Sequence, residues 1–567
     1  MVFGIAFVLV VTGCSSSDNS ASGAKSAEPT PAPTPTESSV VRIKDKGVTA
    51  KGGTVRVLST TEFESFDPAN SYQSDSMEVG RLVYRTLTFI KDTPGEEVSV
   101  QPDLAESLGT PSDQGRTWTY RLRPGLKFED GRPITAQDVK YGVMRSFDHE
   151  VFPSGATWMA DLLANDTGFE SPYATPEKDL TSVEAPDDRT LIFHFAGPQT
   201  DADWILSLSY TAPVPKDKDT RQDYHSHPVA SGPYKIENYV PDKSLNLVRN
   251  ENWDAATDPN RPAYPDRFQI EFNVDRGLAN QRLLAGDGDN AFAVPLNYVL
   301  ASNNYEKVQD SAVKPRFIDG PGPCVNYIAM NTQILKDPDV RHAIALAIDR
   351  RGIQTIGGGD LTGPAADSLI PPNIPGYIAP DLGLSPSGNP DAAKKLLQGK
   401  SVPPLHLATT APPKEANQIR DNLKAVGIEV IVDVVPDNDI DSVIAADDAP
   451  ALTDYPAWCW DWPTVASIVL PVLGPNTDGT SWASTNYAKY FDPKMSGELQ
   501  KLKASTEDSA AITKKTVELA NEIQTTAWPI LPTILNNDPE VVGGNVTNVG
   551  ITPMFGTTDL ITLAVKS

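Results

Sequence analysis

Prolines and glycines interrupt this sequence so often that a mixed fold of helices and strands suits it better than a helical bundle. The 567 residues include 50 prolines and 39 glycines, which favour turns and connecting segments. The sequence has no tandem repeat with a fixed period. A chain of this length is also too long for one ordinary hydrophobic core. We therefore expect a mixed protein of helices and strands with two or three lobes.

Segments of alternating apolar residues and amphipathic segments follow one another from residue 53 onward. Alternation predicts β-strands, because successive side chains of a strand point to opposite faces. The amphipathic segments predict helices, and Thr135 is a suitable N-cap for the first of them. Pro321-Gly322-Pro323 can be neither helix nor central strand, so it marks a crossing between lobes. Strands are expected at 53–58, 117–122, 190–195 and 245–248, and helices from Ala136, over 339–350 and over about 512–525.

The formal net charge of −26 restricts the partners of the chain. A field of this sign repels nucleic acid and anionic lipid headgroups. Nucleic-acid binding is therefore excluded as the main role. The content of 39% hydrophobic and 22% charged residues is that of a globular protein.

The first segment predicts export and not a folded element. Val2 to Val11 is an apolar run of the length of a signal-peptide core, well below the roughly 20 residues that a membrane-spanning helix needs. Val11-Thr12-Gly13-Cys14 resembles a bacterial lipobox, in which the cysteine is acylated. We expect residues 1–14 to be a lipoprotein signal peptide, Cys14 to carry the lipid anchor, and residues 15–50 to be a disordered tether. The alternative is a short buried N-terminal strand.

Several short motifs in the body of the chain carry a resemblance to a known family. They occur in family order between about residues 51 and 535, and the series is more specific than any single motif. The chain resembles the peptide/nickel/oligopeptide-binding group of ABC-importer solute-binding proteins, called family 5. The motifs are KGGTVRV (51–57), SFDPA (65–69), QPDLAES (101–107), RLRPGLKF (121–128), SGPY (231–234), RNENW (249–253), LAGDGD (284–289) and VRHAIALAIDR (340–350).

The resemblance implies an α/β fold like that of type II periplasmic binding proteins, with two large lobes joined by a hinge and a smaller inserted lobe. Lobe I would comprise residues 51–92, 228–320 and 525–567. Lobe II would be inserted at 93–227, and lobe III would span 321–524, with hinges near Pro321 and Thr525. The ligand would be enclosed between the two large lobes by hinge closure.

The segment Trp458-Cys459-Trp460-Asp461-Trp462-Pro463 places three of the nine tryptophans around one carboxylate. In the family, the aspartate of a similar motif pairs with the free amino end of a bound peptide. That role falls on Asp461, with Trp458, Trp460 and Trp462 as walls of the site. An ammonium in a closed aromatic cleft does need an anion beside it. The alternative is that the tryptophans belong to the core and Asp461 caps a helix.

One departure from the family concerns the ligand. The position before the aspartate is usually small, and here it is Trp460, which could narrow the pocket or stack on a ligand other than a peptide. The resemblance further implies that Tyr327 and Asn331, on the strand after the hinge, line the cleft, and that the ligand backbone pairs there as an added strand.

The other two cysteines, Cys324 and Cys459, match positions that are bridged in some oligopeptide-binding members. The resemblance therefore implies a disulfide between them. The alternative is two independent buried thiols.

Other signals do not support a metal, a cofactor or catalysis. His225-Ser226-His227 lacks the further ligands of a metal site, and Asp287-Gly288-Asp289 lacks those of a calcium loop. No nucleophile elbow, HExxH motif or phosphate-binding loop is present in the sequence. We expect no metal, no cofactor and no enzyme activity, and a secreted hydrolase remains the remote alternative.

The expected function is that of a substrate-binding lipoprotein on the outer face of the cell membrane. It would act as a monomer, bind peptides, and deliver them to an ABC permease and ATPase complex. The alternative is the same transport role with an oligosaccharide, a nickel chelate or another small solute, because a fold does not fix its ligand.

Overall fold

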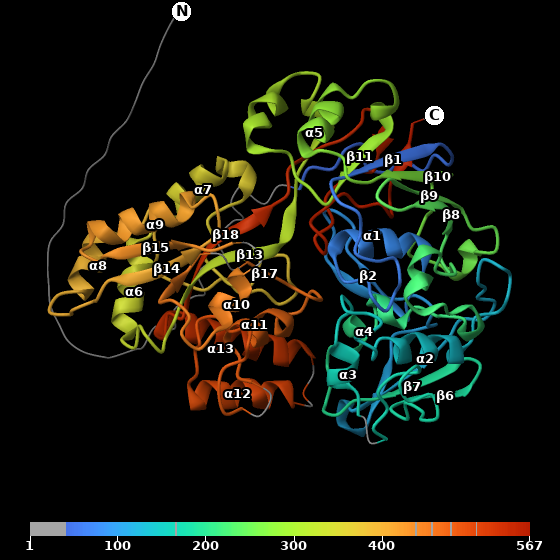
Figure 1. The fold of residues 1–567 in the computed structure, drawn as a ribbon, viewed down its shortest axis with the longest axis horizontal. Coiled ribbons are helices and arrows are strands. Elements are labelled where there is room, and N and C mark those ends of the chain that lie inside the picture. Colours follow the sequence, from blue (N-terminus) through green and yellow to red (C-terminus); the bar gives the residue numbers. More distant parts are fainter. Residues whose placement is uncertain are drawn as a thin grey trace, which may run out of the picture. The chain divides into compact units, whose positions relative to one another are not determined.

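The computed structural model describes residues 41–164, 167–436, 439–454, 457–476, 479–505, 507 and 509–566. Three main sheets, with helices around them, organise this part of the chain (Figure 1). No helix of the described part is both long enough and apolar enough to pass through a bilayer. The predicted signal peptide, the lipidated Cys14 and residues 15–40 of the predicted tether lie outside the described residues.

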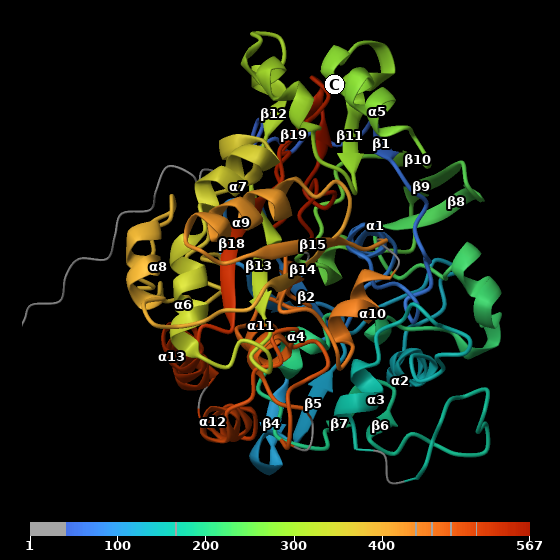
Figure 2. The same ribbon diagram turned by 60° about the vertical axis from the view of Figure 1, so that its left-hand side comes forward.

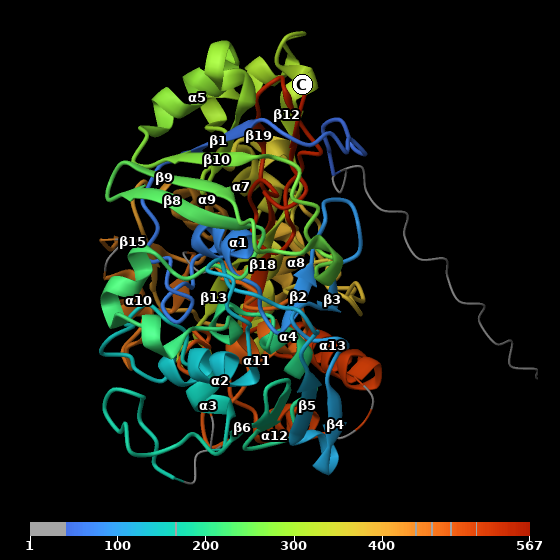
Figure 3. The same cartoon turned by 90° about the vertical axis from the view of Figure 1, so that its right-hand side faces the viewer.

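The first sheet has the strand order β11-β1-β10-β9-β8. The strands β1, β10 and β11 are parallel, whereas β9 and β8 continue the sheet in antiparallel fashion. Helix α1 packs against β8, and Figure 3 shows β1, β10, β9 and β8 in succession. The bounds are β1 (Thr54–Ser59), β8 (Tyr234–Val240), β9 (Ser244–Arg249), β10 (Arg267–Glu271), β11 (Ala293–Leu296), α1 (Ser74–Val83) and α5 (Arg276–Ala285).

The second sheet is antiparallel, with the order β4-β5-β7-β6, and helix α2 packs against β6 and β7. The cap of α2 is the one expected, because Thr135 and Asp138 form a capping box. The bounds are β4 (Thr110–Ser112), β5 (Thr117–Arg121), β6 (Val183–Asp187), β7 (Thr190–His194), α2 (Ala136–Arg145), α3 (Trp158–Leu162) and α4 (Ala202–Ile205). Next to it, β2 (Thr88–Lys91) pairs with β3 (Ser99–Pro102).

The third sheet has the order β15-β14-β16-β13-β17, and β18 pairs with the other edge of β13. Figure 2 shows β13 and β18 next to each other, with α7 and α9 nearby. The strands are β13 (Pro321–Met330), β14 (Leu405–Thr409), β15 (Val430–Val434), β16 (Leu452–Thr453), β17 (Ala457–Cys459) and β18 (Ile530–Asn537). The helices are α6 (Pro338–Ala347), α7 (Arg350–Gly357), α8 (Pro390–Leu396), α9 (Lys414–Ala425), α10 (Ile440–Ala445), α11 (Ala466–Leu473), α12 (Pro493–Lys503) and α13 (Ser509–Thr526).

Three groups of buried apolar side chains accompany the three sheets. The first core draws on residues 55–84, 212–296, 318 and 542–565, and the second lies within 87–210. Two clusters form the third core, mainly from residues 327–534. We propose that the three expected lobes correspond to these cores.

Three boundaries differ from those expected. The return crossing lies at 538–539 and not at Thr525, because α13 continues through Thr525 and β18 still belongs to the third sheet. Arg42 and Lys44 form bridges to Asp319 and Val549, so residues 41–50 are attached to the first core and are not tether. The helix expected over 339–350 ends at Ala347, and Asp349 caps a second helix, α7.

The chain passes between the first and third cores along one short and one long antiparallel pair. Strand β12 (Phe317–Ile318) pairs with β19 (Glu540–Val541), and β13 then pairs with β18. Contrary to expectation, Pro321-Gly322-Pro323 begins a strand. A register irregularity between Pro321 and Val325 accommodates the missing N–H groups. A further pair, β20 (Val546–Thr547) with β21 (Ala564–Val565), completes the first core.

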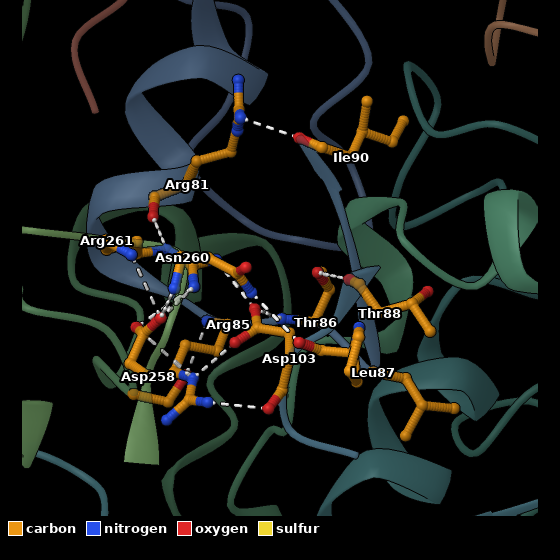
Figure 4. A network of polar contacts seen from close by, with 12 residues as sticks. Arg81, Arg85, Thr86, Leu87, Thr88, Ile90, Asp103, Asp258, Asn260 and Arg261 are labelled. Atoms are coloured by element: carbon orange, nitrogen blue, oxygen red, sulfur yellow. Dashed lines mark hydrogen bonds and ion pairs between the residues drawn. The ribbon is translucent and has the colours of Figure 1, made fainter. Parts of the chain in front are cut away.

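A buried network of arginines and aspartates joins the first and second cores (Figure 4). Asp103 accepts from Arg85 Nε at 2.7 Å and from Arg261 Nη2 at 2.8 Å, and Asp258 lies 3.2 Å from Arg261 Nη1. Burial alone would raise the pKa of Asp103, but the two guanidiniums outweigh it and lower the pKa below its ordinary value. The network therefore fixes this junction with its buried charges paired.

Candidate functional site

The three tryptophans of the segment 458–463 have different surroundings. Trp458 is half-buried in β17, and its Nε1 donates to the carbonyl of Ser467 at 2.9 Å. Trp460 is only 4% exposed and belongs to the third core, so its predicted role as a stacking platform is not supported. Trp462 points to the second core, where its Nε1 donates to Asp201 at 3.0 Å. The segment therefore presents one indole to a neighbouring lobe and not three to a ligand.

Asp461, between Trp460 and Trp462 in the sequence, is half-buried and has no cationic partner among the described residues. Its Oδ1 accepts a hydrogen bond from the Tyr72 hydroxyl at 2.9 Å, and Tyr72 belongs to the segment before α1. Burial raises the pKa of Asp461 to about 6, and the bond from Tyr72 opposes this increase. A partly desolvated carboxylate without a counter-charge favours the approach of a cation.

Two residues expected to line the cleft lie in the interior. Tyr327 is 1% exposed in the third core. Asn331 is also buried, and its Nδ2 donates to the carbonyls of Ala449 and Pro450 while its Oδ1 accepts from the amide of Gln333. The amide of Asn331 thus holds the end of β13, and contact with a ligand by either side chain is not supported.

The strand after the hinge cannot accept an added strand, because β13 is paired on both edges. Strand β18 occupies one edge, and β16 and β17 occupy the other. Among the described strands, the free edge nearest to β13 is that of β17, the last strand of the sheet order, whose residues Ala457 and Cys459 are exposed. A ligand backbone could therefore pair with β17 and not with β13.

The structure joins Cys324 and Cys459 by a disulfide. The two residues lie directly opposite each other in the register of β13 and β17, with a Cα–Cα distance of 4.0 Å. The bond closes a segment with a sequence separation of 135 residues. It attaches the edge strand next to Asp461 to the strand that leaves the hinge.

A cavity of about 190 Å³ lies where the second core meets the segment 461–471. Asp201 in its wall accepts from Trp462 Nε1 and from Thr464 Oγ1, the latter at 2.7 Å, and burial raises the pKa of this carboxyl. The rings of Trp158 and Trp462 meet edge to face at 5.6 Å. These contacts fix the loop that carries Asp461 against the second core.

A larger cavity, of about 680 Å³, lies at the carboxyl edge of the parallel strands of the first sheet. Its walls follow the ends of β1 (Thr61, Glu62), β10 (Arg276) and β11 (Asn297, Tyr298), and include the start of α1 and Asp538 at the return crossing. Open α/β sheets bind their ligands at this edge. Because Asp538 at the return crossing lines this space, we call it the hinge cavity.

Sequence reasoning missed Tyr72, Asp75, Asp201 and Asp538. Asp75 and Asp538 line the hinge cavity, and Tyr72 and Asp201 hold the 461–464 segment. A usable signal existed for the residues that follow β1, because β1 was predicted and ligand sites follow the carboxyl ends of parallel strands. No local pattern marks Asp201 or Asp538.

The histidine pair has ordinary surroundings. The ring of His225 packs against Tyr239, and His227 Nε2 lies 2.9 Å from Glu129, which raises the pKa of this imidazole. No group of three or more His, Cys, Asp or Glu side chains suited to a metal ion occurs in the described part of the chain.

Known proteins resemble this chain in sequence and in fold. A "probable ABC transporter periplasmic-binding protein SapA" of Escherichia coli is 25% identical over 83% of this chain and 85% of its own length. A "probable di/tripeptide-binding protein 5" of Pseudomonas aeruginosa is 26% identical over 64% and 66%. The solved structure of "clavulanic acid biosynthesis oligopeptide binding protein 2" is 29% identical, covers 93% of this chain and 99% of its own, and has a TM-score of 0.83.

The family model of the bacterial extracellular solute-binding proteins, family 5, matches residues 99–481. The expected binding-protein fold is confirmed by this match and by the structural likeness. The resemblance found in the sequence is confirmed as well: the chain belongs to the bacterial extracellular solute-binding proteins of family 5.

Proposed function

We propose that this chain captures peptides and delivers them to an ABC importer. The observation that supports the proposal is the position of Asp461, a carboxylate with no cationic partner among the described residues, beside the free edge of β17. The names of the relatives support it, since they include an ABC-transporter periplasmic protein, a di/tripeptide-binding protein and an oligopeptide-binding protein.

The binding mode combines one charge contact with backbone pairing. The peptide ammonium pairs with Asp461, where a charge-assisted hydrogen bond in a partly desolvated site is strong. The peptide backbone adds to β17 as a further strand, which provides affinity without reading side chains. Such a mode selects a free amino end and tolerates varied sequences.

Transport follows from closure of the first and third lobes over the ligand. Closure is favoured by ligand contacts that exist only in the closed arrangement. The loaded protein, a monomer held to the outer face of the cell membrane through acylated Cys14, presents the peptide to the permease and its ATPase. No catalytic step is required.

The arrangement of the tryptophans favours a peptide over an oligosaccharide. Stacking on sugar rings needs exposed indole faces, but Trp460 is buried and Trp462 is engaged by Trp158 and Asp201. A charged chain end is the better match for Asp461.

Native mass spectrometry of the purified protein tests the proposal, because a closed binding protein can retain its ligand during purification. We expect a series of bound masses that denaturation releases as a mixture of peptides. A single homogeneous sugar or a metal chelate in their place would contradict the proposal.

The affinity for peptides is expected to fall on acidification. Pairing with an ammonium needs ionised Asp461, and a pKa of about 6 leaves this carboxylate mostly ionised at pH 7 and mostly neutral at pH 5. For a peptide without a cationic side chain, we expect about tenfold weaker binding at pH 5 than at pH 7, measured by calorimetry. In Asp461→Asn this tenfold change should disappear, and an unchanged pH profile in that variant would show that another group is responsible.

A further inference from the structure

The hinge cavity is lined by more negative than positive charge. Its walls contain the carboxylates of Glu62, Glu64, Asp75 and Asp538 and a single guanidinium, that of Arg276. A cavity walled by one sign of charge attracts ligand groups of the other sign. The negative charge of the chain as a whole acts in the same direction.

Two of the four carboxylates have local structural roles. Glu62 accepts from the Tyr239 hydroxyl and from the amide of Asp242. Glu64 accepts from the amides of Tyr72 and Gln73, just ahead of α1. These bonds hold the side chains in place but bring no positive charge into the cavity.

The other two carboxylates, Asp75 and Asp538, have no ion pair within the described part of the chain. Asp75 accepts from Asn297 Nδ2 at 2.8 Å and from the amide of Ser76 at 2.7 Å, which are both neutral groups. The carboxylate of Asp538 packs against Gly322 and Gly556, where an added Cβ atom would clash with it. Burial raises the pKa of Asp538 to about 7. The glycines at 322 and 556 thus leave room for a carboxylate that has no cationic partner in the described part of the chain.

An independent observation at Tyr298 also points to a ligand. This side chain lines the hinge cavity, is only 6% exposed, and its hydroxyl has no hydrogen-bond partner in the described part of the chain. A buried hydroxyl without a partner is costly. An N–H donor of a ligand in the cavity would satisfy it.

The hinge cavity lies within reach of a peptide held at Asp461. Tyr72, whose hydroxyl bonds to Asp461, is three residues from Asp75, so the Cα atoms of Tyr72 and Asp75 are at most ~11 Å apart. A peptide of a few residues covers this distance in extended form. The volume of about 680 Å³ accommodates a long side chain.

We propose that the hinge cavity receives the cationic side chain, lysine or arginine, of a bound peptide. The inference rests on the proposed peptide-binding function. The ammonium or guanidinium lies between Asp75 and Asp538 and donates to the Tyr298 hydroxyl. Because Asp538 lies at the return crossing, the cation also contacts the segment that bends when the lobes close.

Calorimetry with matched tetrapeptides tests this inference. The probes are tetra-alanine peptides with lysine, norleucine or glutamate at position two, three or four, since norleucine keeps most of the length of lysine without its charge. At one of the three positions, we expect the lysine peptide to bind at least tenfold more tightly than the norleucine peptide. Asp75→Asn and Asp538→Asn should each reduce that ratio at least threefold and leave the norleucine affinity within about twofold.

Glu306→Gln is the matched control, because Glu306 is exposed and does not line the cavity. Equal affinities for lysine and norleucine, or a preference for glutamate, would overturn the inference. So would a lysine preference that neither aspartate variant changes. If Asp538→Asn no longer unfolds cooperatively on heating, this variant is not properly folded, and the result with Asp75→Asn alone decides whether the inference holds. Failure of every probe to bind the unmodified protein would overturn the peptide-binding function itself.

Discussion

Replacing Asp461 by asparagine is expected to weaken the binding of a free-amine peptide by two to three orders of magnitude. Asparagine keeps the shape and can still accept from Tyr72, but it removes the charge opposite the ammonium. Loss of one partner of a buried ion pair costs about 3–5 kcal/mol, which corresponds to roughly this change in dissociation constant. Isothermal titration of one peptide against both proteins measures the effect.

The N-acetylated form of the same peptide provides the control, because acetylation removes the ammonium. It should bind the unmodified protein about as weakly as the free peptide binds Asp461→Asn. It should lose little further affinity in the variant, so that the two changes are strongly non-additive. Unchanged affinity of the free peptide for Asp461→Asn would exclude Asp461 as the anchor.

Removing the disulfide in the double variant Cys324→Ser, Cys459→Ser is expected to lower the free energy of unfolding by about 4–5 kcal/mol. The bond closes a separation of 135 residues, and the loss of chain entropy in the unfolded state sets this magnitude. Urea titration of the two proteins measures the difference. Peptide affinity should fall as well, because β17 has one paired edge and loses its covalent attachment to β13.

Reduction supplies the control for this prediction. A reducing agent should bring the unmodified protein to the stability of the double variant, and the variant should not respond to the agent. A difference in the free energy of unfolding below about 1 kcal/mol would show that packing of β17, and not the crosslink, holds the strand in place.

The sequence predicted the elements whose signals are local. Strand β1 and helix α2 appear within a residue of their expected starts, because alternation and a capping box act over a few residues. The pairing of β18 with β13 was not predicted, since it joins segments about two hundred residues apart and the apolar run of β18 fits either lobe. The break at Ile348 and Asp349 was missed because the apolar periodicity continues across it.

The candidate site was predicted only where a motif marks it. Asp461 stands in a recognisable segment, but its hydrogen bond to Tyr72 joins positions that no sequence pattern relates. The three tryptophans around it have different surroundings although they are the same residue type. The burial of each ring depends on which lobe it contacts. Asn331 was assigned to the cleft, yet its amide is used by the backbone at the end of β13. Polarity alone does not distinguish these roles.

The two strand pairs at the crossing also limit how the lobes can move. Sliding β12 along β19, or β13 along β18, would break a hydrogen-bonded register, whereas a swing about the short links at 319–320 and 538–539 leaves both registers intact. In the proposed closure, motion would thereby be restricted mainly to this swing. Each closing motion would then bring the same surfaces of the first and third lobes together. A bound ligand would therefore meet the same closed site each time.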